Sequence, residues 1–410
     1  KPDDAEVYNN MGVALKDMGD PDASIDSYKQ ALKIKPNDAE VYNNMGVALK
    51  DKGDPEAAII SYKQALKIKP DYAEVYYNMG AALKGKGSLG SAIDSYKKAL
   101  KIKPDYFEAY NGMGNALYAK GDLEAAIDSY KQAVNINPDH ADAYYNRGHV
   151  LVEKGALDAG IKSYEMALKI KPDHQAARAG KLRQHSYMCD WAALEQDRHL
   201  IATLGTSTES IDPFGFLSFE DAPERHRVRS EAFTKKLYGY KTPLPPAVRP
   251  SQKPQRLRIG YFSADFYEHP VAYLMAKVLE THDRTRFEVY GYSIGPAKDD
   301  DMRQSLIRAF NVFVDVRDMN DEEVALLARQ DKIDIAIDLN GYTENSRTGI
   351  FAYRAAPVQI NYLGYPGTMG ADFIDYIIAD QTLIPIDSQK FYSEKPIYLP
   401  HHYQAQDNTL

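Results

Sequence analysis

"KPDDAEVYNNMGVALKDMGDPDASIDSYKQALKI", residues 1–34, decides the fold of the first part of the chain. The same pattern returns with changes at residues 35, 69, 103 and 137, so a period of 34 residues holds over five units without a gap. A fixed period of this length is typical of repeat proteins in which each unit packs on its neighbours. We therefore expect residues 1–172 to form an α-solenoid.

Each unit shares a glycine, a tyrosine, an alanine and a closing proline. The columns are Gly12, Gly46, Gly80, Gly114 and Gly148; Tyr28, Tyr62, Tyr96, Tyr130 and Tyr164; Ala31, Ala65, Ala99, Ala133 and Ala167; and Pro36, Pro70, Pro104, Pro138 and Pro172. This pattern predicts two helices per unit, with a small residue where they cross, a tyrosine that fills the gap and a turn at Gly19. The proline ends the second helix.

A second column stands two places before the shared glycine. It consists of Asn10, Asn44, Asn78, Gly112 and Asn146. A side-chain amide offers a donor and an acceptor to a peptide backbone, whatever the side chains of that peptide are. The column is therefore a candidate surface for extended polypeptide, although Gly112 interrupts it and asparagine is equally consistent with simple repeat consensus.

The composition places the chain among soluble globular proteins. It has 410 residues, 44% hydrophobic and 26% charged, with a formal charge of −8 and a pI near 5.7. An acidic balance disfavours nucleic acid and anionic membranes as partners. Cys189 is the single cysteine, so an internal disulfide is excluded. No apolar run is long enough to span a membrane and no leader pattern is present, so we expect a cytoplasmic protein.

The period fades after residue 172. Residues 173–241 still favour helices, and we expect Trp191 to pack as an anchor and Cys189 to be buried in its apolar setting. Residues 242–255 contain five prolines, which predicts a semi-rigid extended connector and a domain boundary.

Residues 256–410 change class. The strand-like runs are LRIGYFS (257–263), FEVYGYS (287–293), VFVDV (312–316), IDIAIDL (333–339), VQINYL (358–363) and DYIIA (375–379), and they alternate with helical patterns at 270–280, 302–310, 321–330 and 346–354. Such alternation predicts parallel crossovers and a doubly wound α/β sheet. Ligands of these sheets bind at the carboxyl ends of the strands, so the loops there hold the candidate residues.

The first such loop is SADFYEHP, which brings His269 to the start of a helix at Pro270. The positive end of the helix dipole disfavours an imidazolium, which leaves the ring able to accept a proton as a general base. Asp265 and Glu268 act in the opposite sense. A purely structural histidine at this position is the alternative on spacing alone.

Two further loops carry polar groups or glycines. IDLNGYTENSR (337–347) supplies a carboxylate at Asp338, a carboxamide at Asn340 and a hydroxyl at Thr343 in one turn, which suits a polyol or a phosphate as well as an ordinary capped turn. LGYPGTMG (363–370) is a weak candidate for an anion cradle of backbone N–H groups. KDDDM (298–302) is interpreted as a helix cap rather than a metal motif.

Together these motifs resemble the protein O-GlcNAc transferase family. The resemblance rests on SADFYEHP, DLNGYTENSR, RAAPVQINYLGYPGTMGADFIDYIIAD and YSEKPIYLP, behind tetratricopeptide repeats and an MCDW segment, and it covers essentially the whole chain. It implies an inverting, metal-independent glycosyltransferase of the two-Rossmann (GT-B) type. Such an enzyme moves N-acetylglucosamine from the sugar nucleotide UDP-GlcNAc to serine or threonine hydroxyls of intracellular proteins, nucleocytoplasmic ones in a eukaryote.

The resemblance also implies roles for particular residues. His269 matches the active-site histidine, and Asp338 is a second candidate proton acceptor. The donor-sugar loops match Asn340, Gly341, Tyr342, Thr343, Tyr365, Pro366, Gly367 and Thr368. The acceptor-peptide groove matches Asn10, Asn44, Asn78 and Asn146.

Two alternatives stay open beside this interpretation. SPINDLY-type relatives share the architecture, so O-fucosylation from GDP-fucose is one alternative, and a non-catalytic scaffold that recruits proteins is the other. The second Rossmann lobe of the family is expected to follow Leu410. We therefore expect residues 1–410 alone to bind a sugar nucleotide weakly or not at all, and the oligomeric state cannot be read from the sequence.

Overall fold

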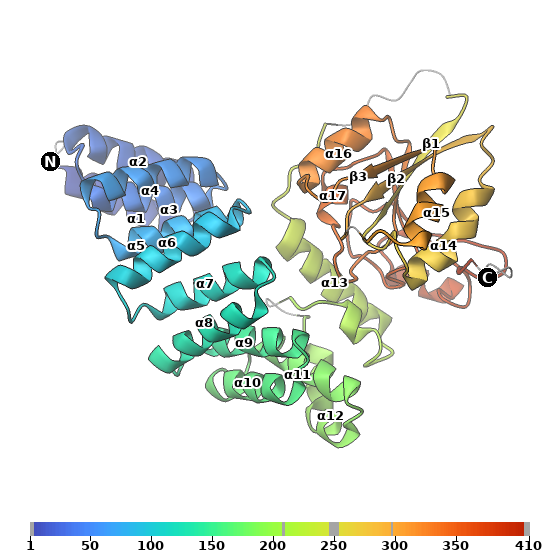
Figure 1. The fold of residues 1–410 in the computed structure, drawn as a ribbon, viewed down its shortest axis with the longest axis horizontal. Helices are drawn as coiled ribbons and strands as arrows, with labels where there is room; N and C mark the ends of the chain where they lie inside the picture. The colour runs from blue at the N-terminus through green and yellow to red at the C-terminus, as the bar shows by residue number, and fades with distance from the viewer. Residues whose placement is uncertain (1–3, 207–209, 246–253, 297, 406–410) are drawn as a thin grey trace. The chain divides into compact units, whose positions relative to one another are not determined.

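The computed structural model describes residues 4–206, 210–245, 254–296 and 298–405. The chain divides into two compact units, Lys1–Asp190 and Trp191–Leu410 (Figure 1). The first contains the repeats and the second contains the sheet, which confirms the predicted fold class of a helical solenoid followed by an α/β lobe.

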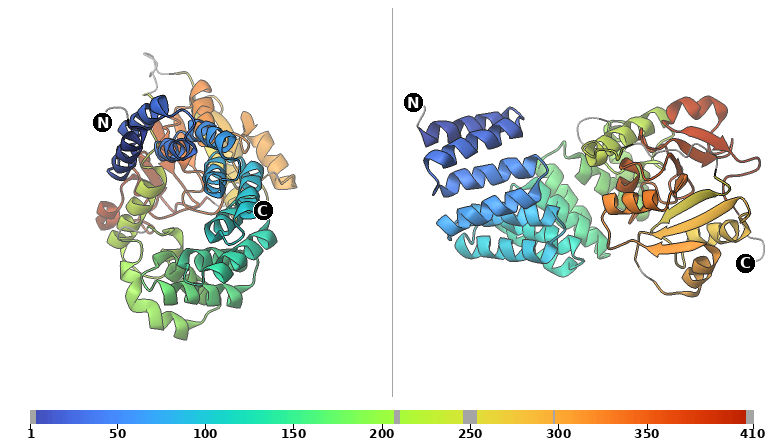
Figure 2. Two further views of the ribbon diagram at one scale, coloured as in Figure 1. Left: turned by 90° about the vertical axis from the view of Figure 1, so that its left-hand side faces the viewer. Right: turned by 90° about the horizontal axis from the view of Figure 1, so that it is seen from above.

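The first unit is a stack of antiparallel helix pairs, seen from further directions in Figure 2. Its helices are α1 (Ala5–Asp17), α2 (Pro21–Ile34), α3 (Ala39–Asp51), α4 (Pro55–Ile68), α5 (Ala73–Gly85), α6 (Leu89–Ile102), α7 (Phe107–Ala119), α8 (Leu123–Ile136), α9 (Ala141–Glu153), α10 (Leu157–Ile170) and α11 (Gln175–Tyr187). Aspartates begin the first pair: Asp4 accepts a hydrogen bond from Glu6 N and Asp20 accepts one from Ala23 N. These side chains satisfy amides that a helix leaves unpaired at its start.

The glycine and tyrosine columns meet where the two helices of a repeat cross. A Cβ atom on Gly12 would lie 2.5 Å from the Tyr28 ring, and one on Gly46 would lie 2.5 Å from the Tyr62 ring. The tyrosine rings are buried, and Gly19 takes a φ of 81° in the turn between the helices. The predicted roles of the glycine, the tyrosine and the turn are confirmed.

The odd-numbered helices line one side of the stack. Odd-numbered helices of successive repeats contact one another, whereas even-numbered helices do so to a smaller extent. In a curved stack the closer neighbours lie on the inner face, so the odd helices form the concave surface. Helix α11 packs on α9 and α10 in the same way, so the first compact unit continues beyond the fifth repeat to Asp190.

The turn after α11 departs from the prediction. Cys189 is exposed, with a φ of 54°, and Trp191 is 65% exposed. The expected burial of Cys189 and the expected anchoring role of Trp191 are therefore both wrong. The apolar composition of this stretch does not report burial, because Cys189 lies in the exposed turn between α11 and α12 (Trp191–Asp197).

The second unit is built on one parallel sheet. Its strands are β1 (Leu257–Ser263), β2 (Phe287–Ser293), β3 (Val312–Asp315), β4 (Ile335–Asp338), β5 (Val358–Asn361), β6 (Tyr376–Ala379) and β7 (Lys395–Tyr398), in the order β3-β2-β1-β4-β5-β6-β7. All the pairings are parallel. The six predicted strands are confirmed, and the seventh, with its half-exposed pattern, was not predicted.

Helices cover both faces of the sheet. Beside α12, the unit contains η1 (Arg198–Thr203), η2 (Phe214–Phe216), α13 (Pro223–Tyr238), α14 (Pro270–Thr281), α15 (Asp301–Ala309), α16 (Asp321–Gln330), α17 (Gly349–Ala352) and η3 (Ile386–Phe391). Helices α14 and α15 pack on the face that carries Tyr261 and Ile337, and α13, α16 and α17 pack on the face that carries Phe262. This two-sided cover explains why the strands read as continuous apolar runs.

The proline-rich connector lies partly outside the described residues, because residues 246–253 are not among them. Its first part is docked on the second unit rather than extended in solvent. Leu244 N donates to Tyr353 O at 3.1 Å, and Arg329 donates to Pro245 O.

Candidate functional site

The candidate site lies where strands β1 and β4 end. The chain leaves β1 toward β2 and β3 on one side of the sheet, and β4 begins the other side, so the strand order reverses between these two strands. Ligands of open parallel sheets bind at such a switch point, outside the carboxyl ends of the strands. Phe262 pairs with Asp338, so residues 263–269 and 338–343 leave the sheet side by side.

Asn340 joins these two loops. Its Oδ1 accepts from Ala264 N at 2.7 Å, and its Nδ2 donates to Asp265 Oδ2 at 2.7 Å and to Thr343 Oγ1 at 3.2 Å. The Asn340 side chain is fully buried, and its bonds to Ala264 and Asp265 form away from water. The carboxamide thus fixes the spacing of the two loops.

His269 lies at the start of α14, as predicted. It is the N-cap residue, Pro270 follows in the first helical turn, and its ring is about one third exposed. Val271 N donates to His269 Nδ1 at 3.3 Å, which places the proton of the neutral ring on Nε2. The ring thus caps the helix and presents an N–H group outward in this arrangement.

Asp265 is a site residue that sequence reasoning did not select. It is 7% exposed, and its Oδ2 lies 3.7 Å from His269 Nδ1. Burial raises the pKa of Asp265, while a charge on His269 and the hydrogen bond from Asn340 act in the opposite sense. The four-residue spacing from Asp265 to His269 across one tight loop was the available signal.

Asp338 is buried at the end of β4 beneath its own loop. Its Oδ1 accepts from Asn340 N at 2.9 Å and from Gly341 N at 3.0 Å. Burial raises the pKa of Asp338 to about 6, although the two backbone donors oppose this rise. Asp338 therefore anchors the loop, and its carboxylate has no exposed face toward a substrate.

Tyr342 and Tyr365 lie inside the protein. The Tyr342 hydroxyl donates to Met369 O at 2.6 Å and contacts Thr234, and the Tyr365 hydroxyl lies 3.2 Å from Ser230 Oγ. Both phenols thus fasten the loops to α13. Thr343 is half-buried, so a sugar nucleotide that reaches residues 341–343 would contact Thr343 and the backbone rather than the buried ring of Tyr342.

The glycines of the loop at 363–370 serve close packing. A Cβ on Gly364 would lie 2.3 Å from Leu339 O, and one on Gly370 would lie 2.3 Å from Glu231 N. Gly370 N donates to Thr368 Oγ1, so its amide is already paired. The anion cradle expected from this loop is therefore not supported by Gly364 or Gly370, since contacts within the protein account for both.

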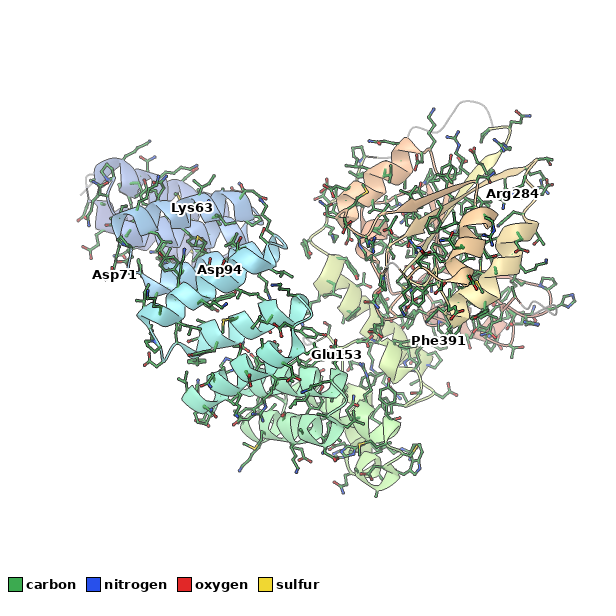
Figure 3. All side chains as sticks on the ribbon, in the orientation of Figure 1. Lys63, Asp71, Asp94, Glu153, Arg284 and Phe391 are labelled. Atoms are coloured by element: carbon green, nitrogen blue, oxygen red, sulfur yellow. The ribbon has the colours of Figure 1, made fainter. Side chains whose placement is uncertain are left out.

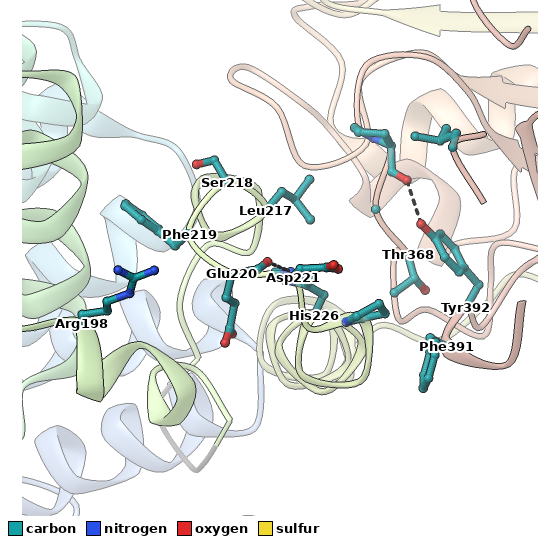
Figure 4. A pocket seen from close by; sticks show the side chains of 14 residues that line it. Arg198, Leu217, Ser218, Phe219, Glu220, Asp221, His226, Thr368, Phe391 and Tyr392 are labelled. Atoms are coloured by element: carbon teal, nitrogen blue, oxygen red, sulfur yellow. Dashed lines mark hydrogen bonds between the residues drawn. The ribbon is translucent and has the colours of Figure 1, made fainter. Parts of the chain in front are cut away.

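A cavity of about 650 Å³ adjoins the same loop (Figure 4). Pro366, Gly367 and Thr368 line it, and residues 217–226 form the opposite wall. Phe391, labelled in Figures 3 and 4, also lines it. The cavity brings together three of the predicted donor-loop residues, but His269 and Asp338 do not line it.

Thr368 is held by a buried carboxyl group. Its Oγ1 donates to Glu394 Oε2 at 2.7 Å, and Met369 N donates to Glu394 Oε1 at 2.6 Å. Burial raises the pKa of Glu394, and these hydrogen bonds oppose the rise. Glu394 belongs to the YSEKPIYLP motif, so this contact gives that motif a structural role.

The asparagine column lies in the first unit, on the odd-numbered helices. The pairs Asn44–Asn9, Asn78–Asn43 and Asn146–Asn111 are joined by bonds of 3.1, 3.0 and 3.1 Å from the Nδ2 of the first to the Oδ1 of the second. These bonds orient each carboxamide. Gly112 interrupts the column because a Cβ there would lie 2.8 Å from the Tyr96 ring.

Other chemistry finds no support in the described parts of the chain. Asp300 accepts from Arg303 N at 2.8 Å and begins α15, so the capping interpretation of KDDDM is confirmed. Residues 4–206, 210–245, 254–296 and 298–405 contain no group of three or more His, Cys, Asp or Glu side chains arranged to hold a metal ion. In the same ranges no helix is long and apolar enough to cross a membrane.

A model described as Glycosyl transferase family 41 matches residues 231–409. The match contains every loop of the candidate site, so these loops lie in a glycosyltransferase domain. Models described as TPR repeat match residues 15–53, 48–87, 83–121 and 114–155, and one described as Tetratricopeptide repeat matches residues 141–174.

Two relatives of the chain carry a named activity. The chain is 41% identical over 171 residues to a probable UDP-N-acetylglucosamine–peptide N-acetylglucosaminyltransferase SEC of Arabidopsis thaliana, an alignment that covers 40% of this chain and 18% of that protein. It is 42% identical over 172 residues to the UDP-N-acetylglucosamine–peptide N-acetylglucosaminyltransferase of Caenorhabditis elegans, covering 41% of this chain and 15% of that protein. The chain thus spans less than a fifth of either relative.

The chain is also similar to a solved structure. A Thermobaculum terrenum O-GlcNAc transferase mutant is 28% identical in sequence, and the comparison covers 81% of this chain and 58% of that chain with a TM-score of 0.49.

Proposed function

We propose that this chain supplies the acceptor-binding repeats and one catalytic lobe of a protein glycosyltransferase. The enzyme moves N-acetylglucosamine from UDP-GlcNAc to serine or threonine hydroxyls of intracellular proteins. The observation that carries the proposal is the joined pair of loops at the switch point of a family 41 domain, with His269 at the mouth of α14 and Asn340 bonded to Asp265.

His269 is the residue of this chain best placed to act on a proton. With Nδ1 capping the helix, the neutral ring offers an Nε2–H donor. Release of the cap would let Nδ1–H face Asp265, now 3.7 Å away, and leave Nε2 free to accept the proton of an acceptor hydroxyl. A positioned base of this kind contributes roughly 10²- to 10⁴-fold to a rate.

The loops at 341–343 and 366–368 are the proposed donor contacts. Thr343 and the backbone around Gly341 lie at the switch point, and Thr368 is held in place by Glu394. The lobe offers neutral hydroxyl and amide groups there, which suit a sugar. We propose that the reaction uses no metal ion, and transfer that persists in excess EDTA is the expected result.

The column of Asn10, Asn44, Asn78 and Asn146 is the proposed acceptor surface. Asn44, Asn78 and Asn146 each use one N–H for the bond to the preceding repeat, so Oδ1 and the second N–H of each side chain remain for a peptide backbone. A backbone contact of this kind accommodates acceptors of varied sequence.

The decisive experiment offers both UDP-GlcNAc and GDP-fucose to the full-length protein with an acceptor peptide, and weighs the peptide by mass spectrometry. The expected result is the added mass of one N-acetylhexosamine. Added deoxyhexose would identify the fucose donor instead. Peptide that binds but gains no mass from either donor would leave only the scaffold interpretation and would contradict the proposal.

A further inference from the structure

Two buried oxygen atoms near the candidate site lack a hydrogen-bond partner among the described residues. They are Asp338 Oδ2 and Asn361 Oδ1. The other polar atom of each side chain already forms hydrogen bonds: Asp338 Oδ1 accepts from two backbone amides, and Asn361 Nδ2 donates to Tyr365 O at 2.9 Å. A buried acceptor without a donor costs about 1–3 kcal/mol, so two at one place require an explanation.

The two residues that carry the orphaned atoms both lie beside Gly341. Asp338 and Asn361 are register partners on the parallel strands β4 and β5. Gly341 N donates to Asp338 Oδ1, and a Cβ on Gly341 would lie 3.2 Å from Asn361 Oδ1. Two acceptors in this arrangement repel each other unless one of them carries a hydrogen.

We propose that at pH 5.5 Asp338 is a neutral carboxylic acid whose Oδ2–H donates to Asn361 Oδ1, which makes it a positioning residue for the loop of Asn340 and not a proton acceptor. One proton satisfies both orphaned atoms. The acid keeps Oδ1 as the acceptor for Asn340 N and Gly341 N, so the loop stays anchored. The role of the loop in catalysis rests on the proposed function, whereas the protonation does not.

The surroundings of Asp338 favour the neutral form. Burial is the largest influence on its pKa, and only the backbone amides of Gly341 and Asn340 oppose it. No charged side chain of the described residues contributes to that pKa. On α13, the pKa of Tyr238 is raised to about 12, mainly by burial and in smaller part by Asp321 and Asp338. From β1 the register partner is Phe262, and from β5 it is Asn361, neither of which titrates.

The variant Asp338→Asn separates a neutral acid from an ionised carboxylate. Its Oδ1 can accept the two backbone amides and its Nδ2 can donate to Asn361, so it reproduces the proposed bonds without a titrating proton. Asp338→Ala is the matched variant that loses the bonds to the backbone amides and the bond to Asn361. Both variants are made in the whole chain and compared by infrared difference spectroscopy at pH 5.5, where an ordinary aspartate is almost fully ionised.

The wild type is expected to show the C=O stretch of a carboxylic acid that Asp338→Asn lacks. The buried Asp265 and Glu394 carboxyl groups are present in both proteins and cancel in the difference. Asn361→Leu is expected to move this band to higher frequency, because the acid then loses its acceptor. No band in the difference spectrum, as for an ionised carboxylate bridged to Asn361 by water, would overturn the proposal.

Thermal unfolding and activity give independent measurements. Asp338→Asn is expected to melt at or above the wild-type temperature between pH 5.5 and 8, while Asp338→Ala melts lower throughout. In the full-length protein, Asp338→Asn is expected to restore most of the activity that Asp338→Ala loses. A loss of 10²-fold or more in Asp338→Asn would assign proton acceptance to Asp338 and overturn the proposal. If the wild type transfers no sugar, the proposed function fails while the infrared and melting results still decide the protonation.

Discussion

Asn340 Nδ2 donates to Asp265 Oδ2 at 2.7 Å, and this buried bond connects the loop after β4 to the loop that carries His269. The same carboxamide accepts from Ala264 N. Two residues that are 75 positions apart in the chain are thus linked directly at the switch point of the sheet. The position of the imidazole at the start of α14 depends on a residue in a different loop.

Asn340→Leu is expected to destabilise the second unit by about 2–5 kcal/mol, because it leaves the buried Ala264 N–H without its acceptor and removes a donor from the buried Asp265 Oδ2. Calorimetry of the whole chain measures the loss. Thr343→Val is the matched control: it removes only the 3.2 Å contact with Asn340 and should cost less than about 1 kcal/mol. Equal melting of Asn340→Leu and the control would show that the bond does not hold the loops.

The sequence predicts the frame of this site well and its interior poorly. The 34-residue period and the alternating runs locate the repeats, the six strands and the helix start at Pro270, because each is a local pattern of apolar residues and caps. Hydrogen bonds such as that between Asn340 and Asp265 join residues distant in sequence, and no local pattern reports them. The loop tyrosines were placed as donor contacts by resemblance, whereas Tyr342 and Tyr365 are buried against α13. The exposure of Trp191 depends likewise on where the chain turns, which composition does not encode.

His269→Asn separates helix capping from proton transfer. Asparagine is a strong N-cap residue, so this variant should keep the stability of the wild type, whereas His269→Ala should lose about 0.5–2 kcal/mol with the cap. In the full-length protein both variants are expected to lose 10²-fold or more in transfer, because neither carries an imidazole. Stability is read by calorimetry and transfer by mass spectrometry. Wild-type turnover in His269→Asn would remove the ring from the mechanism and leave it a structural role.

Two glycines of the repeats are expected to respond to alanine in opposite directions. Gly46→Ala places a methyl group 2.5 Å from the Tyr62 ring, an overlap that should destabilise the first unit by about 1–3 kcal/mol. Gly90 lies in α6, and a Cβ there meets no atom within 4 Å. Gly90→Ala should therefore stabilise the first unit by about 0.4–1 kcal/mol, because alanine lowers the conformational entropy of the unfolded chain. Both effects are measured by urea unfolding followed by circular dichroism. The same sign for both variants would contradict the packing role of the glycine column.

His226 predicts a dependence of stability on pH. Burial lowers its pKa, against the opposing hydrogen bond to Glu220 O, so the unfolded chain binds a proton below its ordinary pKa of about 6.5 while the folded chain does not. Stability from this group is therefore complete above that pH and falls as the pH drops toward the folded pKa. The free energy that separates the wild type from His226→Gln should shrink between pH 7.5 and 5.5, and groups common to both proteins cancel. A difference that stays constant over this range would show that His226 is protonated in the fold as readily as outside it.

The carboxamide column predicts an effect on acceptor binding alone. Asn78 is oriented by its bond to Asn43 Oδ1, so Asn78→Ala removes one fixed donor and acceptor from the proposed peptide surface. In the full-length protein the KM for an acceptor peptide should rise about 2- to 10-fold, the worth of one hydrogen bond, with kcat and the donor KM unchanged. Asp94→Ala, an exposed position on the second helix of the same repeat, is the control and should leave the peptide KM unaltered. Gly112→Asn should not extend the column, since a Cβ there would overlap the Tyr96 ring; instead it should destabilise the repeat unit. An unchanged peptide KM in Asn78→Ala would exclude Asn78 from acceptor binding and favour repeat consensus as the reason for the asparagine.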